Sequence, residues 1–390
     1  MSDLTNVFTD IADAIRAKTE TQITYKPTEM ASAINNIQSG GGAMEIITGN
    51  IITSFNVPVT IPNSITDMVY CFDSCSNFNQ PVNIPNSVTN MVYCFASCSN
   101  LNQPVTISNG VTNMAYCFRS CNSFNQPIII PNSVTDMFHC FDSCSNFNQP
   151  VTISNSVTNM AYCLSSCFNF NQPITIPNSV TNMVYCFGSC YNFNQPVNIP
   201  NNVTNMTTCF FSCSNFNQPV DIPNGVTSLF DCFENCRDFN SPVNIPNSVT
   251  SMAYCFTNCR NFNQPVDIPS SVINMSNCFN NCYNFNQPMN IPNSVNNMVS
   301  CFRLCKSFAS VIHVACNPNL NVSNMLQSAN QLKVKTIITD DPSKFLWTNA
   351  KSIVGAVVTW TQDGSNYYNA TYNIYINYSA DPFNEPDPVF

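Results

Sequence analysis

The chain has 390 residues, a formal net charge of −9 and only 8% charged residues. This composition excludes the basic surface that nucleic-acid binding requires, and it gives no electrostatic attraction to an anionic membrane. No run of 18 apolar residues is present, and the N-terminus lacks a basic region followed by an apolar one. We therefore expect no membrane insertion and no signal peptide.

Residues 1–39 have the pattern of two short helices. Leu4, Phe8, Ile11 and Ile15 recur at helical spacing, and a second apolar face lies between residues 28 and 37. Residues 40–42 are three glycines, which indicate a flexible joint, and residues 43–54 have the apolar content of a strand cap. We expect residues 1–39 to be a helical docking or oligomerisation segment, with a cap on the following domain as the alternative, and residues 40–54 to be a linker and N-terminal strand cap.

The N-terminal segment also resembles a known group of proteins. Residues 11–19 (IADAIRAKT) and 27–34 (PTEMASAI) are similar to the start of many tail and fibre proteins from bacteriophages and prophages of Gram-positive gut bacteria. The resemblance covers about a tenth of the chain. It implies attachment to a phage tail or baseplate through residues 1–39.

A strict 23-residue repeat dominates the rest of the sequence. It carries two cysteines four residues apart, and it predicts a solenoid of about 12 turns over residues 55–330. The first cysteine of the pair recurs without insertion at positions 71, 94, 117, 140, 163, 186, 209, 232, 255, 278 and 301.

Each repeat has two apolar segments. Val82 and Ile84 are two residues apart and β-branched, which predicts one short strand per turn with this face buried and a parallel sheet formed by stacking. Asn79 and Gln80 recur before the strand, and we expect their amides to hydrogen-bond along the stack. The second apolar set has spacings of 3, 3, 1, 3 and 3, which favour a short helix or 3₁₀ turn on the back of each repeat. Its members in one copy are Val88, Met91, Cys94, Phe95, Cys98 and Leu101.

The chain contains 23 cysteines, and 22 of them form the two columns of the repeat. Regular columns favour buried thiols over the disulfide scaffold of a small secreted domain. A zinc site is the weakest alternative, because the pairs are spaced Cys-x-x-x-Cys and the only histidines are His139 and His313. We expect no metal and no cofactor.

The repeat is similar to the BspA-like leucine-rich repeats of bacterial surface proteins. The resemblance rests on residues 84–91 (IPNSVTNM), on the Cys-Phe-x-x-Cys segment and on residues 77–82 (NFNQPV). It implies an extracellular leucine-rich-repeat solenoid used in adhesion. The chain departs from that family where Phe and Met replace Leu or Ile, and where Cys replaces the alanine before Phe.

Positions that vary between copies are candidates for ligand binding, because the fold of the repeat does not require a particular residue type there. The column after the second cysteine contains aromatic and basic residues, which are enriched at binding hot spots, and the outward strand column contains polar ones. A solvated surface without a ligand is the alternative. The candidate binding residues are Phe168, Tyr191, Arg237, Arg260, Tyr283, Lys306, Asp221, Asn244, Asp267 and Asn290.

Residues 331–390 depart from the repeat. Residues 322–325 are expected to form a last degenerate turn, shifted by four residues. Residues 356–360 and 372–378 alternate in polarity around a turn sequence, which predicts a β-hairpin that caps the solenoid or mediates oligomerisation.

No catalytic motif is present, and the 21 carboxylates form no repeating pair, so we expect a non-catalytic protein. The sequence favours a phage or prophage tail protein, assembled in the bacterial cytoplasm and located in the virion, whose solenoid binds a host-surface protein or glycan. A homo-oligomer is expected, most simply a trimer. The alternatives are a BspA-like adhesin at the bacterial cell surface and a purely architectural virion protein.

Overall fold

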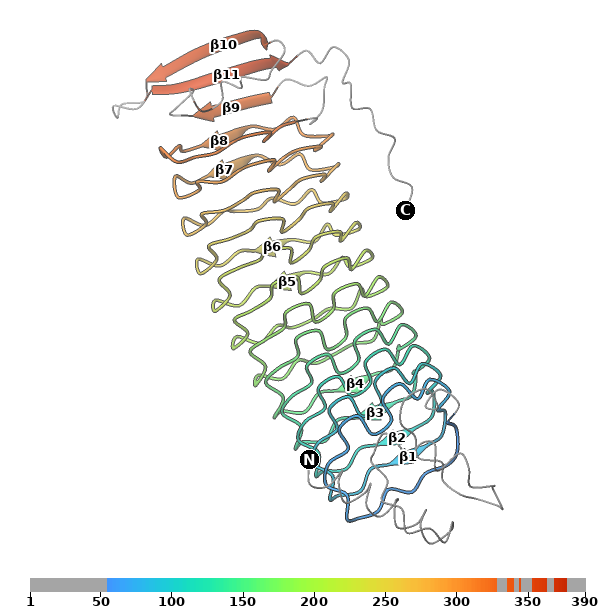
Figure 1. Ribbon diagram of the computed structural model, residues 1–390. Coiled ribbons are helices and arrows are strands. Elements are labelled where there is room, and N and C mark those ends of the chain that lie inside the picture. Colours follow the sequence, from blue (N-terminus) through green and yellow to red (C-terminus); the bar gives the residue numbers. More distant parts are fainter. Residues whose placement is uncertain (1–54, 328–334, 340–343, 345–352, 363–367, 377–390) are drawn as a thin grey trace, which may run out of the picture. The chain divides into compact units, whose positions relative to one another are not determined.

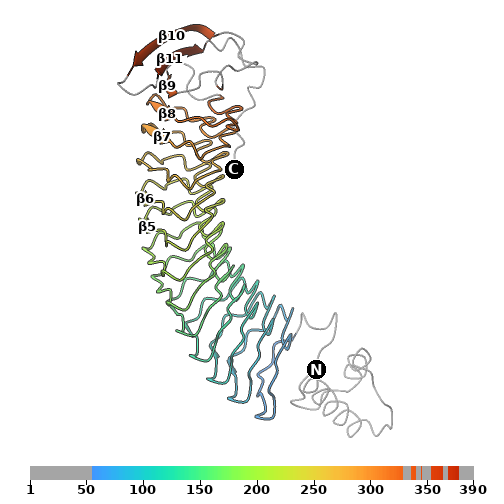
Figure 2. The same cartoon turned by 90° about the vertical axis from the view of Figure 1, so that its left-hand side faces the viewer.

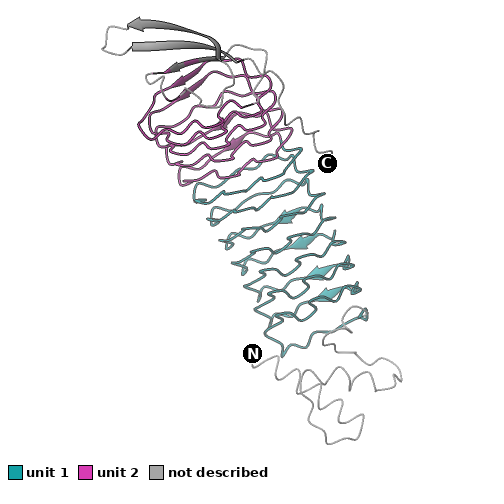
Figure 3. Cartoon of the chain, turned by 45° about the horizontal axis from the view of Figure 1, so that its top comes forward, with its two compact units in different colours: residues 1–216 teal, residues 217–390 magenta. Residues whose placement is uncertain are grey.

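The computed structural model describes residues 55–327, 335–339, 344, 353–362 and 368–376. The chain divides into two compact units, Met1–Phe216 and Asn217–Phe390 (Figure 3). This division falls inside the segment 55–330 that the sequence predicts as one solenoid. The segments 1–39 and 40–54, with the predicted N-terminal helices, lie outside the described residues, as does the boundary at residue 330.

Unit 1 is a stack of 23-residue turns, and four of the described turns have a short strand at the predicted place (Figure 1). The strands pair in parallel with partners 23 residues apart, β1 with β2 and β3 with β4. In every pair the first residue is buried and the second is exposed, which confirms the predicted alternation. The strands are β1 (Val82–Asn83), β2 (Val105–Thr106), β3 (Ile128–Ile129) and β4 (Val151–Thr152).

Unit 2 contains repeat turns of the same kind, with their strands along one side of the stack (Figure 2). Strands β5 and β6 pair in parallel, and a five-stranded sheet has the order β10-β11-β9-β8-β7. In that sheet β10 and β11 are antiparallel, as the two alternating segments predict, and β9 joins them to the repeat strand β8. The strands are β5 (Val220–Asp221), β6 (Val243–Asn244), β7 (Met289–Ile291), β8 (Ile312–Val314), β9 (Lys335–Thr339), β10 (Ile353–Gln362) and β11 (Tyr368–Ile376).

The core of each unit consists of apolar columns. Val88, Met91, Cys94, Phe95 and Cys98 are all 0% exposed, and their counterparts in the following turns are buried too. The phenylalanine rings stack on one another from turn to turn, with centroids 5.5 Å apart for Phe95 and Phe118. Burying one such side chain contributes about 1.5–3 kcal/mol, so many identical turns together produce a stable core that one turn could not.

The second apolar segment forms hydrogen-bonded turns, so the prediction of a short helix or 3₁₀ turn is wrong for the described repeats. Half of the backbone amides follow the expected local pattern: Cys94 N donates to Met91 O and Cys98 N to Phe95 O, both at 3.1 Å. The amides that alternate with these donate to the next turn instead, for example Phe95 N to Cys117 O at 2.8 Å. A helix would direct every amide within its own segment, and this segment uses alternate amides to join the turns.

Two positions in nearly every repeat have positive φ without being glycine. In one copy they are Tyr93 (φ 54°) and Ser97 (φ 60°). Left-handed backbone costs an L-residue about 1–2 kcal/mol, and Asn and Asp tolerate it better than most residues. The second column contains Ser in unit 1, Asn at 235, 258 and 281, and then Leu304 (φ 60°).

All 23 cysteines are thiols, as predicted, and all but Cys71 and Cys316 are buried. In nine copies the second cysteine of the pair donates its S–H to a backbone carbonyl 26 residues earlier, with Sγ–O distances of 2.9–3.1 Å; Cys98 donates to Phe72 O. Burial raises the pKa of the Cys94 and Cys98 thiols well above the ordinary value, so they stay protonated. The second cysteine therefore fills the core and gives a second hydrogen bond to a carbonyl that already accepts from a backbone amide, as Phe72 O does from Cys75 N.

The amide column before the strand has the predicted structural role. Asn79 Oδ1 accepts from Asn102 N at 2.9 Å, and Asn102 Oδ1 accepts from both Asn125 N and Gln126 Nε2 in the next turn. Both amide types thus hydrogen-bond along the stack.

The last described repeat turn is shifted by one residue, so the predicted shift of four is wrong. Asn297 pairs with Asn321, which is 24 residues later, and Phe302 N donates to Met325 O as Phe279 N donates to Cys301 O. Met325 therefore occupies the position of the first cysteine. The local turn absorbs one additional residue while the inter-turn hydrogen bonds are kept. Among the described residues, none forms a helix long and apolar enough to cross a membrane.

Leu304 gives a test of the backbone argument. Within the described residues Asn281 Oδ1 is buried without a hydrogen-bond partner, although Asn281 Nδ2 donates to Asn258 Oδ1. An asparagine at 304 would tolerate the positive φ and place an amide donor one turn from that oxygen. We expect Leu304→Asn to raise the free energy of unfolding of the full chain by about 1–2 kcal/mol in chemical denaturation.

The control is Leu304→Ala, which removes the leucine side chain but adds no donor and stays strained at positive φ. We expect it to be less stable than the wild type. Equal stability of the Asn and Ala variants would contradict the interpretation.

Candidate functional site

The ten predicted binding residues lie on the outside of the two units. Phe168 and Tyr191 belong to unit 1, and the other eight belong to unit 2. All are exposed except Tyr283, which is half-buried. The structure therefore gives two separate candidate surfaces, one in each unit.

The unit 1 surface is an aromatic pair. Phe168 and Tyr191 are 39% and 44% exposed, and their rings stack with centroids 4.9 Å apart and an interplanar angle of 8°. In the same column the neighbouring turns carry Ser145 and Ser214, whose side chains are too small to cover an aromatic ring. The pair thus presents apolar surface that the repeat itself does not require.

The unit 2 surface has basic residues around one ring. Arg260 Cζ lies 5.1 Å and Lys306 Nζ 4.2 Å from the centroid of the Tyr283 ring, so both cations make cation–π contacts. Arg237 is exposed one turn before Arg260. The outward strand residues Asp221, Asn244, Asp267 and Asn290 are all exposed as predicted.

Stacked tyrosines in unit 1 form a third aromatic column. Tyr93 and Tyr116 stack at 4.3 Å, and His139 stacks at 4.7 Å on Tyr116 and at 4.3 Å on Tyr162. Each ring face is largely covered by the next ring. This packing supports a structural role for the column, because a sugar platform needs an open face.

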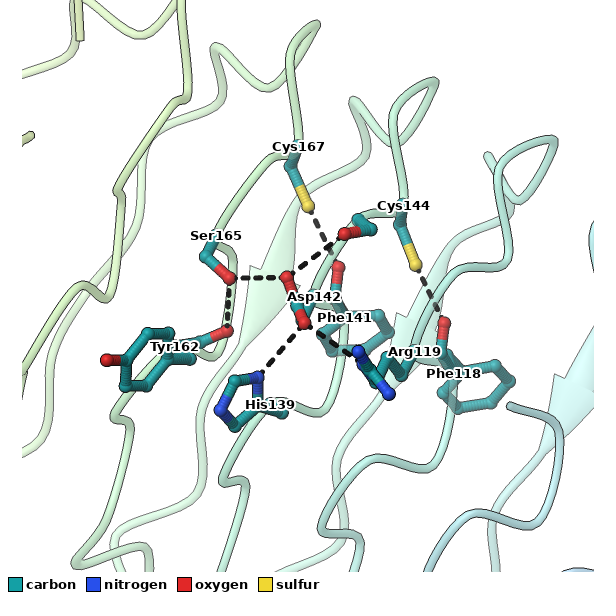
Figure 4. Close-up of polar contacts among 10 residues, drawn as sticks. Phe118, Arg119, His139, Phe141, Asp142, Cys144, Tyr162, Ser165 and Cys167 are labelled. Carbon is teal, nitrogen blue, oxygen red and sulfur yellow. Dashed lines mark hydrogen bonds and ion pairs between the residues drawn. The ribbon is translucent and has the colours of Figure 1, made fainter. Parts of the chain in front are cut away.

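One polar cluster in unit 1 was not apparent from the sequence (Figure 4). Asp142 is only 9% exposed, and Asp142 Oδ2 accepts from His139 Nδ1 at 3.0 Å and from Arg119 Nε at 3.3 Å. Its other oxygen, Oδ1, accepts from Ser165 Oγ at 2.6 Å and from Ser143 Oγ at 3.2 Å. Burial opposes ionisation of Asp142, but the hydrogen bonds from His139 and Ser165 outweigh it and lower the pKa of this carboxyl.

The Asp142 cluster has the groups of a hydrolytic triad without its arrangement. In a triad the histidine accepts the proton of the serine. Here Ser143 and Ser165 both donate to the carboxylate, and the imidazole is held between two tyrosine rings. The cluster therefore fixes the side chains of neighbouring turns. It also shows that the column after the first Cys-Phe is not a uniformly free surface, because Asp142, Ser165 and Thr257 are buried.

Unit 2 contains a carboxyl pair at Asp231 and Glu234. Burial, a hydrogen bond to Asp231 and the Asp231 charge raise the pKa of Glu234 to about 8, and burial raises the pKa of Asp231. The pair accordingly shares one proton at neutral pH. Among the described residues no group of three or more His, Cys, Asp or Glu side chains could hold a metal ion.

Comparison with known families decides the classification of the chain. The family described as "Mycoplasma protein of unknown function, DUF285" matches six overlapping segments that run from residue 45 to residue 341. The chain belongs to this family. The match begins after the N-terminal segment. No curated protein matches the sequence.

Several solved structures are similar to this family member. A leucine-rich cell surface protein from Faecalibacterium prausnitzii is 18% identical with a TM-score of 0.44, covering 73% of this chain and 79% of that chain. A leucine-rich-repeat protein from Eubacterium ventriosum is 15% identical with a TM-score of 0.40, covering 68% of this chain and 80% of that chain. A leucine-rich-repeat protein from Bacteroides ovatus is 16% identical with a TM-score of 0.36, covering 66% of this chain and 86% of that chain. These likenesses concern the repeat fold and assign no ligand.

The comparisons bear differently on the two resemblances drawn from the sequence. The solved structures found are those of bacterial leucine-rich-repeat proteins. Nothing in the comparisons supports a phage-tail segment, and residues 1–39 lie outside both the family match and the described residues.

The Asp142 cluster predicts a site-specific loss of stability. We expect Asp142→Asn to lower the free energy of unfolding by about 2 kcal/mol at pH 7, because it weakens charge-assisted hydrogen bonds to a buried group. The contribution of the ionised carboxylate is present above the ordinary carboxyl pKa of 3.8 and is lost as the pH falls through the lower pKa of the folded state. Denaturant unfolding of both proteins between pH 3 and 7 measures this.

The matched control is Asp73→Asn, at the same position of an earlier turn. Asp73 is half-buried and accepts from Ser74 Oγ at 3.4 Å. We expect Asp73→Asn to change the free energy of unfolding by less than about 0.5 kcal/mol. An equal loss in the two variants would refute the special role of the cluster.

The carboxyl pair predicts alkaline sensitivity. The folded state keeps a proton on Glu234 up to about pH 8, whereas the unfolded chain loses it near the ordinary pKa of 4.5. Stability from this group therefore falls as the pH rises through that window. We expect Tm to fall less in Glu234→Gln than in the wild type between pH 5 and 9, measured by circular dichroism.

Asp221→Asn serves as the control, since it removes one exposed carboxylate from the same unit. Its Tm should follow the wild-type pH dependence. Parallel curves for all three proteins would show that the pair does not share a proton in this way.

Proposed function

We propose that this family member is a non-catalytic, surface-displayed binding protein, with adhesin-like attachment to a protein or glycan through exposed columns of its repeat. This is the alternative interpretation of the sequence, and the repeat fold supports it better than a phage-tail role. The scaffold keeps its buried columns nearly constant and varies its exposed ones, which is the arrangement of a protein that presents side chains.

The observation that carries the proposal is the Phe168–Tyr191 pair. Two large aromatic side chains lie exposed on neighbouring turns where the flanking turns have serine. Their mutual stacking covers one face of each ring and holds both in a fixed orientation. Exposed, preorganised aromatic residues of this kind contribute strongly to binding, because little side-chain entropy is lost.

Two parts of the proposal concern context. Location at the bacterial cell surface is proposed together with the binding role. Attachment of residues 1–39 to a phage tail or baseplate, and a homo-oligomer such as a trimer, stay predictions from the sequence.

The binding role predicts that the aromatic pair is required. We expect the labelled full chain to bind at least one member of an array of cell-surface glycans and extracellular-matrix proteins. The double variant Phe168→Ser/Tyr191→Ser should bind that member at least about tenfold more weakly. Serine is the residue of this column in both flanking turns, so the fold should tolerate it, and an unchanged circular dichroism spectrum checks this.

Two results would contradict the proposal. One is an array without any bound member, and the other is equal binding by the variant. Immunogold labelling of a producing culture, with antibody against residues 43–316, checks the location: label on intact cells is expected, and label on the tails of phage-like particles would favour the virion interpretation.

A further inference from the structure

Positive charge is concentrated in one column of unit 2. Residues 55–327 contain only five Lys and Arg residues, and three of them, Arg237, Arg260 and Lys306, occupy the position after the second cysteine. Tyr283 occupies the same position in the turn between Arg260 and Lys306. We call Arg237, Arg260, Tyr283 and Lys306 the basic column.

The charges of the basic column are not neutralised by carboxylates. Within the described residues no carboxylate lies at ion-pair distance from these three cations, whereas Arg119 in unit 1 pairs with Asp142 at 3.3 Å. Arg260 and Lys306 instead contact the ring of Tyr283, from the preceding and the following turn. The ring holds two cations on neighbouring levels of the stack.

A bound anion would relieve the repulsion between the cations of the basic column. Stacked turns are about 4.8 Å apart, so Arg237 and Arg260 are like charges on adjacent turns. The repeat does not need them, because Ser76, Ser99 and Ser214 occupy the same column elsewhere in the chain. A row of unpaired cations that the fold does not require indicates a ligand with several negative charges along its length.

The backbone beside the column is unavailable to a peptide strand. The carbonyls of Arg237, Arg260 and Tyr283 already accept from amides of the next turn, at 3.1, 3.0 and 2.9 Å. Strand addition depends on an open row of such groups. The ligand must therefore be recognised through side chains.

Two of the four side chains next to the basic column, Asn261 and Asn284, are amides. Asn261 Nδ2 donates to Asp238 Oδ1 at 3.1 Å, and Asn284 Nδ2 donates to Asn261 Oδ1 at 3.3 Å, in an exposed ladder one residue further along each turn. Exposed amides offer both donors and acceptors to hydroxyl groups. Three cations and a nearby carboxylate, in a chain with net charge −9, are too weakly basic for nucleic acid.

We infer that the basic column binds an acidic polysaccharide, with Arg237, Arg260 and Lys306 contacting its carboxylate or sulfate groups and the amide ladder contacting its hydroxyls. This inference rests on the proposed binding function and specifies the ligand class for its unit 2 surface.

The test is binding of the full chain to immobilised dextran sulfate, polygalacturonate and neutral dextran at low salt. Binding to at least one acidic polymer, not to neutral dextran, and loss of that binding in high salt are expected. The variant Arg237→Ser/Arg260→Ser/Lys306→Ser should bind at least tenfold more weakly. Preference for dextran sulfate would identify sulfate as the recognised group, and preference for polygalacturonate would identify carboxylate.

A charge-matched control separates the column from net charge. The variant Asn83→Asp/Thr106→Asp/Asn198→Asp changes the net charge by the same amount in the exposed strand column of unit 1, which has Asp at position 221 in unit 2. We expect its binding to the acidic polymers to change less than twofold.

Four outcomes would overturn the inference: no binding to either acidic polymer, equal binding to neutral dextran, unchanged binding by the serine variant, or an equal loss in the control. Polyglutamate that competes better than both polysaccharides would also overturn it, in favour of an acidic protein. Binding of the wild-type chain to the surface array, lost in the Phe168→Ser/Tyr191→Ser variant, would leave the proposed function standing in each case.

Discussion

Hydrogen bonding between consecutive turns is the constraint on which the structure of each unit depends. A described repeat turn of 23 residues has no helix and at most three strand residues, so it cannot satisfy its own backbone. Every second amide of the back segment donates to the following turn, and the strands pair at the same interval. The repeat length is therefore fixed by the backbone, and the side-chain columns follow from it.

The inter-turn ladder explains several unusual residues. Reaching the next turn requires a backbone that reverses locally, which accounts for two residues of positive φ in each copy. Ser and Asn in the second of these columns limit the strain. The second cysteine donates to a carbonyl of the previous turn, which valine or alanine of similar size could not do. Its conservation within the repeat thus reflects hydrogen bonding and packing together, and its buried, protonated state argues for a structural thiol.

The strands and the core were predictable from the sequence because their signal is strong and local. Val82 and Ile84 are buried and alternate with exposed residues, which is the period of a half-buried strand. The back segment was misread because a spacing of 3, 3, 1, 3 and 3 arises from successive three-residue turns as well as from a helix. Sequence spacing reports which residues face the core, but it does not reveal where each amide donates. The register of Met325 was missed for the same reason, because the hydrogen bonds between turns, and not the side-chain pattern, define that register.

For the surface, the sequence shows which positions vary between repeats but not whether a variable position is exposed. Variation between repeats correctly indicated that Phe168, Tyr191, Arg260 and Tyr283 do not form the core, and the structure places them outside or half-buried. The same rule failed for Asp142, because a variable position can be filled by a residue whose partners come from adjacent turns.

In a stack, a substitution changes the environment of the equivalent residues before and after it, so a ligand surface and a structural cluster can occupy the same kind of column. A structural cluster and a ligand surface differ in whether their charged side chains have partners within the protein. Asp142 has donors on both oxygens, whereas Arg260 and Lys306 have only the Tyr283 ring between them. A buried charge destabilises the fold when one of its partners is removed, and an exposed row of like charges without counter-charges leaves binding energy available for a ligand.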